Sequence, residues 1–252
     1  MKIQYCSDLH LEFPKNKEYI RINPIKPEAD ILILAGDIVP FAVIDEHQDF
    51  FDYLSDNFKM TYWIPGNHEY YYFDAVNKSS TFSENIRNNV ILLNNTAVQH
   101  QDTKFIFSTL WSKISLANQW NIERGLSDFH VIKYNGNRFT AEVFNQLHSD
   151  CINFINQELL VENASKTVVI THHVPTFMNY PEIYKGSVIN EGFAVELFET
   201  IEASKVEYWI YGHSHYNTAD FKIGKTQMLT NQLGYVQRNE NLLFDSEKCF
   251  NI

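Results

Sequence analysis

The stretch that decides the fold of this chain reads Ile31-Leu32-Ile33-Leu34-Ala35-Gly36-Asp37. Four consecutive aliphatic residues are typical of a strand buried on both faces, as in a parallel or mixed sheet covered by other layers, so we predict a strand over 31–36. Gly36 allows a tight turn, and Asp37 places a carboxylate where α/β folds bind their ligands. Because an apolar strand followed by Gly-Asp is common, this stretch marks a site only if other strands end in matching chemistry.

The composition is that of a globular protein. The chain has 252 residues, of which 44% are hydrophobic and 15% aromatic, enough to bury a large core. It contains no internal repeats, linkers or low-complexity segments. We therefore expect one α/β domain that spans residues 1–252.

The charge and the cysteines limit the partners and the compartment. A net charge of −11 makes a nucleic-acid polymer an unlikely partner, because polyphosphate binding requires a basic face. No apolar run approaches the roughly 18–20 residues that span a bilayer, and the strand-like residues 1–6 leave no room for a signal peptide. Three cysteines without framework spacing indicate reduced thiols. We expect a cytoplasmic protein with no membrane partner.

Four other predicted strands also end in polar side chains. Asp8 and His10 follow a strand over 2–7, and their spacing of two residues lets both side chains converge on one ion in extended backbone. The strands over 61–64, 167–171 and 206–211 end in Gly-Asn-His-Glu, His-His and Gly-His-x-His, respectively. The candidates that these motifs supply are Asn67, His68, His172, His173, His213 and His215. Of the adjacent pair, we expect one histidine to be a ligand and the other to line the pocket.

The rest of the chain supplies the scaffold. Helices are predicted over 41–58, with His47 on the surface, over 140–163, with Cys151 buried, and over 193–202. Strands are predicted over 90–93, 96–100 and 104–108 as a meander, and in the tail 218–248 as an antiparallel pair joined through Gly224-Lys225. Segments 109–137 and 176–192 lack periodicity and should fold over a functional surface. Packing is the favoured role for the prominent side chains Trp111, Trp120, Arg124 and His130.

Taken together, the five strand ends resemble the calcineurin-like metallophosphoesterase superfamily. The chain is most similar to a small bacterial branch that begins with Ser-Asp-Leu-His-Leu-Glu-Phe, here residues 7–13. That branch also has a Thr-Leu-Trp stretch, here 109–111, and a late Gly-Tyr, here 234–235. The resemblance implies an α/β fold with four α-β-β-α layers, in which two mixed sheets are flanked by helices.

The resemblance also implies two metal ions. The first would be held by Asp8, His10, Asp37 and His215, and the second by Asp37, Asn67, His172 and His213. Asp37 would bridge them, and a carboxylate can hold two cations roughly 3.5–4 Å apart. Oxygen and imidazole ligands without thiolates suit manganese, iron or zinc.

The implied activity is hydrolysis of a small phosphodiester or phosphomonoester. A hydroxide that bridges the metals would attack phosphorus, Asp37 and Asn67 would hold the metals, and His68 would act as general acid. The protein phosphatases of the superfamily carry an Asp-Arg pair shortly after Gly-Asp, but residues 36–41 here read Gly-Asp-Ile-Val-Pro-Phe, so protein substrates are disfavoured. The alternatives are a nuclease, which the acidic composition disfavours, and a non-catalytic binding module, which should have lost ligands.

Overall fold

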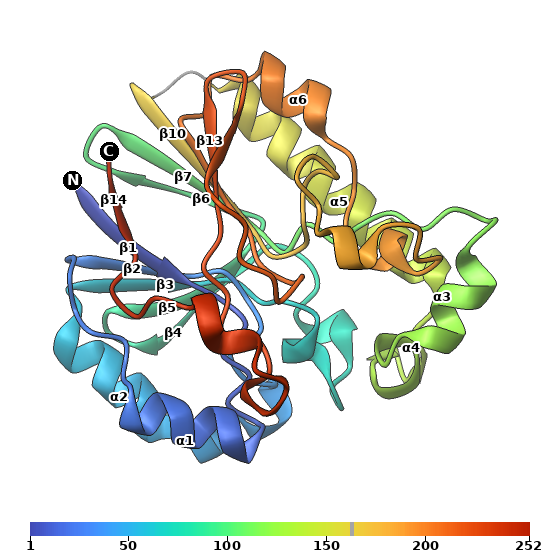
Figure 1. Cartoon of the computed structure of the whole chain (residues 1–252), viewed down its shortest axis with the longest axis horizontal. Coiled ribbons are helices and arrows are strands. Elements are labelled where there is room, and N and C mark those ends of the chain that lie inside the picture. The colour runs from blue at the N-terminus through green and yellow to red at the C-terminus, as the bar shows by residue number, and fades with distance from the viewer. Residues whose placement is uncertain (162–163) are drawn as a thin grey trace.

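The computed structural model describes residues 1–161 and 164–252. Two six-stranded mixed sheets form its centre (Figure 1). The first runs β14-β1-β2-β3-β5-β4, and its strands are β1 Lys2–Cys6, β2 Ile31–Leu34, β3 Met60–Trp63, β4 Phe82–Arg87, β5 Val90–Asn94 and β14 Cys249–Asn251. The second runs β12-β13-β11-β10-β7-β6, and its strands are β6 Thr96–His100, β7 Thr103–Ser108, β10 Lys166–Thr171, β11 Tyr208–Ile210, β12 Phe221–Ile223 and β13 Thr226–Leu229.

Strand β2 shows why its sequence is continuously aliphatic. Ile31 and Ile33 belong to the hydrophobic cluster formed by the facing sides of the two sheets, whereas Leu32 and Leu34 belong to the cluster on the outer sides. Helices α1 (Pro14–Ile22) and α2 (Gln48–Asn57) lie over the first sheet, and α5 (Ala141–Leu160) and α6 (Phe198–Ala203) lie over the second (Figure 1). The predicted four-layer α-β-β-α arrangement is confirmed.

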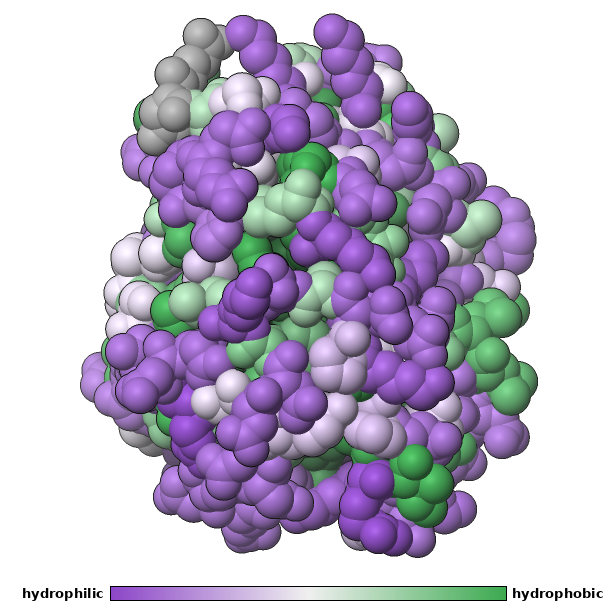
Figure 2. Space-filling model, turned by 90° about the vertical axis from the view of Figure 1, so that its left-hand side faces the viewer, coloured by the Kyte–Doolittle hydropathy of each residue, from purple (hydrophilic) through white to green (hydrophobic). Residues whose placement is uncertain are grey.

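The outer surface is mostly polar, as burial of the apolar faces between layers requires. Figure 2 shows one face, on which hydrophilic residues cover most of the area and hydrophobic residues form small separate areas. Among the described residues, no helix combines the length and apolar character needed to cross a membrane. The cysteines are free, and Cys6 and Cys151 are buried, the latter as predicted.

The predicted meander is wrong. Strand β5 pairs with β3 and β4 in the first sheet, whereas β6 pairs with β7 in the second. The chain therefore passes from one sheet to the other at Asn95, which has a left-handed φ of 45°. Strand β4 was not predicted because its sequence Phe-Ser-Glu-Asn-Ile-Arg is polar and largely exposed, as befits the edge of a sheet.

The helices also differ in part from the prediction. Residues 41–58 form a 3-10 segment, Phe41–His47, followed by α2, and His47 is buried with 4% exposure, so its predicted surface position is wrong. Three residues per turn place side chains differently from the 3.6-residue period that the prediction assumed. Helix α1 was missed because its sequence is largely polar, with two buried side chains, Asn16 and Ile20.

The remaining predicted elements agree with the structure in part. Helix α5 confirms the long helix, although residues 162–163 of the predicted range lie outside the described residues. The hairpin β12–β13 turns at Gly224 as predicted, but the rest of the tail forms 3-10 turns and β14. Segment 109–137 contains three short units, α3 Gln119–Gly125, α4 Asp128–Val131 and the small hairpin β8 Lys133–Tyr134 with β9 Asn137–Arg138.

Candidate metal centre

The ends of five parallel strands meet where the two sheets face each other. In the first sheet, β1, β2 and β3 are mutually parallel and lead to Asp8, Asp37 and Asn67, respectively. In the second sheet, β10 and β11 are parallel and lead to His172 and to His213 with His215. The structure therefore brings together all seven side chains that the sequence predicted as metal ligands.

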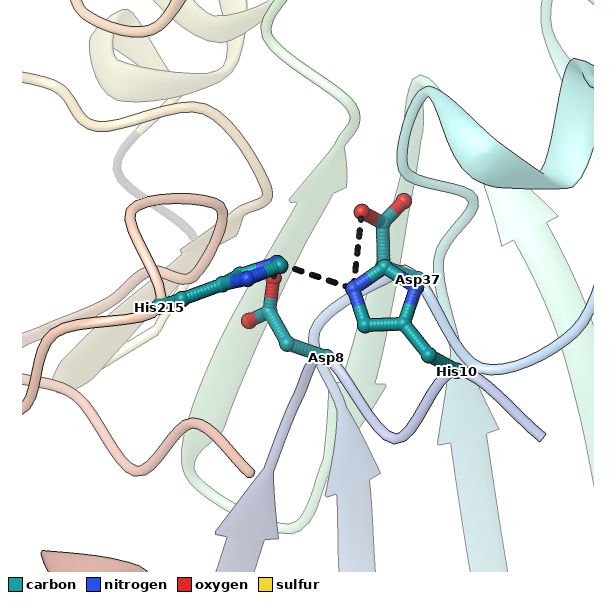
Figure 3. A group of neighbouring side chains, drawn as sticks. All are labelled: Asp8, His10, Asp37 and His215. Carbon is teal, nitrogen blue, oxygen red and sulfur yellow. Dashed lines mark hydrogen bonds and ion pairs between the residues drawn. The ribbon is translucent and has the colours of Figure 1, made fainter. Parts of the chain in front are cut away.

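Four of these side chains form what we call cluster one: Asp8, His10, Asp37 and His215 (Figure 3). They project from three loops, of which one carries both Asp8 and His10, toward a common point, and their potential ligand atoms lie within 4.8 Å of one another. The Nε2 atoms of His10 and His215 are 2.8 Å apart, and His215 Nε2 lies 3.4 Å from Asp8 Oδ1. Lone pairs that converge in this way are the arrangement that a metal cation requires.

Cluster two consists of Asp37, Asn67, His172 and His213. His172 Nε2 lies 3.4 Å from Asp37 Oδ1, 3.3 Å from Asn67 Oδ1 and 3.0 Å from His213 Nδ1. Asp37 thus presents Oδ1 to this cluster, whereas its Oδ2 lies 3.6 Å from His10 of cluster one. The donor set of both clusters, oxygen and imidazole nitrogen, fits metal ions.

Buried carboxylates make this region favourable for cations. Although burial opposes it, the charge of Asp37 raises the pKa of His172 to about 9. Against the same effect of burial, hydrogen bonds to Asp8 and Glu240 raise the pKa of His215 to about 10. In contrast, burial and the neighbouring His173 and His172 lower the pKa of His213. The field that favours protons on two of these rings would equally favour metal cations between them.

The backbone at the centre is strained. Asp8, His10, Asp37, His213 and His215 all have left-handed φ angles, between 48° and 75°. Such a conformation costs roughly 1–2 kcal/mol for each residue other than glycine. Residues of this kind concentrate at functional sites, where the surrounding structure holds them.

Glu69, whose role the sequence reasoning did not assign, holds two of these loops. Its buried carboxylate accepts backbone N–H bonds from Asp37 at 2.9 Å, Ile38 at 2.6 Å and Gly66 at 2.6 Å. Burial raises the pKa of Glu69 to about 8. A Cβ on Gly66 would collide with the Asp37 carboxylate and the His172 ring, which explains the glycine there. The Gly-Asn-His-Glu block therefore joins the strand ends of β2 and β3.

His68 lies beside both clusters. Its ring stacks on Tyr71 with centroids 4.0 Å apart, its Nδ1 lies 2.8 Å from Glu12 Oε1, and its Nε2 lies 3.3 Å from the Tyr235 hydroxyl. Burial opposes protonation, but Asp37 and Glu12 outweigh it and raise the pKa of His68. Sequence reasoning assigned no role to Glu12 or Tyr235, although both lie in blocks that carry the resemblance.

His173 does not line the pocket, so that prediction is wrong. Its ring is fully buried behind His213, with ring centroids 4.2 Å apart, and it also packs against Trp111 and Phe144. Neither of its nitrogens has a hydrogen-bond partner within the described part of the chain. Side chains on adjacent residues diverge, so only His172 points into the centre.

A cavity of about 360 Å³ opens above the clusters. The predicted covering segments contribute Leu126 and Asp128 from 109–137, and Tyr180 and Tyr184 from 176–192. Trp111 is buried as predicted. Trp120 is 66% exposed and lies under the Arg124 guanidinium, and Arg124 and His130 are exposed as well, so the packing role predicted for these three is wrong.

Comparison with known proteins identifies the family. Residues 1–217 match the sequence model of the calcineurin-like phosphoesterases. The chain belongs to this family. The matched part contains every member of cluster one and cluster two. The resemblance that the strand-end motifs indicated is confirmed.

Two relatives and one solved structure are similar to this chain. An uncharacterised protein of Acanthamoeba polyphaga mimivirus is 33% identical and aligns over 95% of this chain and 93% of its own length. A 3',5'-cyclic-nucleotide phosphodiesterase of Nostoc sp. is 21% identical over 77% of this chain and 59% of its own length. The crystal structure of phosphopantetheinyl hydrolase from Mycobacterium tuberculosis superposes with a TM-score of 0.67 at 15% identity, covering 94% of this chain and 90% of that one, and shows a shared fold.

Proposed function

We propose that this phosphoesterase hydrolyses a small phosphodiester, or less efficiently a phosphomonoester, with two metal ions. The observation that carries the proposal is the position of Asp37, whose two oxygens face different clusters at the base of one cavity. Asp8, His10 and His215 would complete one metal site, and Asn67, His172 and His213 the other. When bound, manganese, iron or zinc would supply Lewis acidity and activate water at neutral pH.

His68 is the proposed general acid. Nδ1 of its ring can donate to Glu12 at 2.8 Å, which fixes the ring and leaves a proton on Nε2 when the ring is protonated. His68 lines the cavity, so this Nε2 proton is placed for transfer to a departing alkoxide. Tyr71 supports the ring by stacking on it.

The charges around the cavity favour a diester. Arg238 is the one lysine or arginine among the described residues that line it, whereas Asp128 and Glu240 add negative charge. A phosphomonoester carries about −1.5 to −2 charge near neutral pH, but a diester has a single ionised oxygen. The relative named a phosphodiesterase supports the same class.

Other residues of the cavity lining favour an apolar or planar group on the substrate. The apolar and aromatic side chains that line the cavity are Leu126, Tyr180, Tyr184, Ile189 and Phe193. Aromatic side chains of this kind can stack on a ring or cover an apolar chain. We therefore expect a small diester with one such substituent.

The alternatives have less support. A nuclease needs a basic track for the phosphate backbone, and the chain has a net charge of −11. A non-catalytic binding module needs no intact metal ligands, yet all seven are present and gathered. A single domain over 1–252 and a cytoplasmic location stay predictions.

The test compares a diester and a monoester that share a leaving group, and adds a phosphoserine peptide to represent protein substrates. Protein reconstituted separately with manganese, iron and zinc is assayed with bis(nitrophenyl) phosphate, nitrophenyl phosphate and a phosphoserine peptide. We expect the highest kcat/KM for the diester and the lowest for the peptide, with Asp37→Asn as the control for contaminating activity. Absence of turnover with every metal, or a preference for the peptide, would overturn the proposal.

A further inference from the structure

Asp128 contacts the one candidate ligand that is neither a carboxylate nor an imidazole. Its Oδ1 accepts a hydrogen bond from Asn67 Nδ2 at 2.9 Å and a second from the Tyr71 hydroxyl at 2.9 Å. The side chain is 3% exposed. It belongs to α4, in the segment 109–137 where the sequence showed no periodicity.

An amide can ligate a metal only through its oxygen, and it can rotate to present either end. An ionised carboxylate offers acceptors alone, so the end of Asn67 that faces Asp128 must be the nitrogen. The Asn67 oxygen then points the opposite way, to 3.3 Å from His172 Nε2 in cluster two. Tyr71 holds the Asp128 oxygen in place, and the same tyrosine stacks under His68.

We propose that Asp128 is a positioning residue, which fixes the Asn67 amide with its oxygen toward cluster two and so sets the metal affinity of that cluster. The inference rests on the proposed function only in requiring that cluster two binds a metal. Partners that orient metal ligands typically contribute 10–100-fold in metal affinity. Asp128 would act in this way from a segment that belongs to neither sheet.

The decisive variant is Asp128→Asn, which keeps the size of the side chain but lets an amide face an amide. Asn67 then loses the constraint on its orientation, and we expect affinity for the second manganese ion to fall roughly 10–100-fold while the first is retained. The measurement is a manganese titration of metal-free protein by calorimetry, so the readout is binding and not turnover. Thermal unfolding of the metal-free variants checks that they fold.

A charge-conserving exchange separates positioning from a general loss of negative charge. In the double variant Asp128→Asn/Asn67→Asp, the new carboxylate can face the metal with one oxygen and accept from the new amide with the other. We expect this variant to recover second-site affinity to within about 10-fold of the unmodified protein. Asn67→Asp alone sets two carboxylates against each other and should not reproduce the recovery.

The two single variants and the double variant form a cycle whose non-additivity measures the contact. Strong non-additivity supports the inference. Additive effects, an unchanged second site in Asp128→Asn, or a single bound manganese in the unmodified protein would each overturn it. A protein that binds two metals with this coupling but hydrolyses none of the tested esters would contradict the proposed function alone. Tyr71→Phe, which keeps the stacked ring, should lower the affinity by much less than Asp128→Asn.

Discussion

Clusters one and two share Asp37 but are supported in different ways. In cluster one, the outer nitrogens of both histidines meet carboxylates: His215 Nδ1 lies 2.8 Å from Glu240 Oε2, and His10 Nδ1 lies 3.3 Å from Glu12 Oε1. In cluster two, His172 Nδ1 meets the backbone oxygen of Ala35 at 2.9 Å. The Nε2 of His213 is buried without a partner in residues 1–161 and 164–252.

This difference predicts unequal metal binding. Among the proposed ligands, cluster one has two carboxylates, with two further carboxylates behind its histidines, whereas cluster two has one carboxylate and an amide. Carboxylates behind a histidine raise its basicity as a ligand. Cluster one should therefore bind its metal more tightly. The metal affinity of cluster two should depend more on the orientation of its amide, Asn67.

The largest effect of a single substitution is expected at Asp37, which both clusters share. Because Asp37 serves both, Asp37→Asn should lower the occupancy of both metals, whereas Asn67→Ala should empty mainly cluster two. The accompanying loss in kcat/KM for Asp37→Asn should exceed the roughly 10²–10⁴-fold that general acid catalysis contributes, because activation of water is lost with both metals. Elemental analysis of the purified variants measures the metals. Two full equivalents in Asp37→Asn would show that it does not bridge.

The contrast between the clusters was only partly visible in the sequence. The seven proposed ligands follow buried strands at short fixed spacings, so local sequence predicts their chemistry. The extended backbone expected at Asp8 and His10 is wrong, because both have left-handed φ angles, and the meeting of separate strand ends depends on the fold that the resemblance implied. The supporting residues do not follow such strands: Asp128 lies in a segment without periodicity, and Glu240 reaches His215 from a 3-10 turn in the tail. Their positions depend on how distant segments pack, which local spacing does not encode.

The fold likewise has features that the local sequence predicts and features that depend on how distant segments pack. The aliphatic run of β2 predicted burial on both faces because the pattern is intrinsic to the strand. The placement of β5 and β6 in different sheets was missed. The sequence Asn94-Asn95 is compatible both with a chain reversal within one sheet and with a crossing between two sheets. Similarly, polar sequences concealed α1 and β4 because few of their side chains are buried.

The next effect in size concerns His68, which lies beside the clusters and is proposed to belong to neither. General acid catalysis typically contributes 10²–10⁴-fold and matters most when the departing alkoxide is a strong base. His68→Asn should therefore slow an alkyl ester by that factor and a nitrophenyl ester far less. Measuring kcat/KM for the two esters, together with metal content, tests this.

Two other outcomes for His68→Asn are distinct. Similar losses with both esters would indicate that the ring stabilises charge on the phosphoryl oxygens and does not donate a proton. Loss of metal along with activity would make the ring a ligand, a role that its closeness to His10 and Glu12 also allows. The backbone N–H of His68, which donates to Asp37 Oδ1 at 2.9 Å, is unchanged by the substitution.

The smallest effect on metal affinity is expected at Glu240, which contacts His215 of cluster one. Glu240→Gln keeps an oxygen that can accept from His215 Nδ1 and from the Tyr235 backbone N–H, which now lie at 2.8 and 2.7 Å from Oε2, but it removes the charge. Because only the electrostatic part of the support is lost, manganese affinity should fall about 10-fold at cluster one, the low end for such partners. Cluster two should be unaffected. The matched control is Glu199→Gln, which removes the same charge from an exposed side chain on α6. If both variants lower the affinity equally, long-range charge and not the contact with His215 distinguishes the two clusters. If Glu240→Gln weakens the lower-affinity of the two sites instead, cluster one is the weaker site and the order of affinity is the reverse of the one proposed.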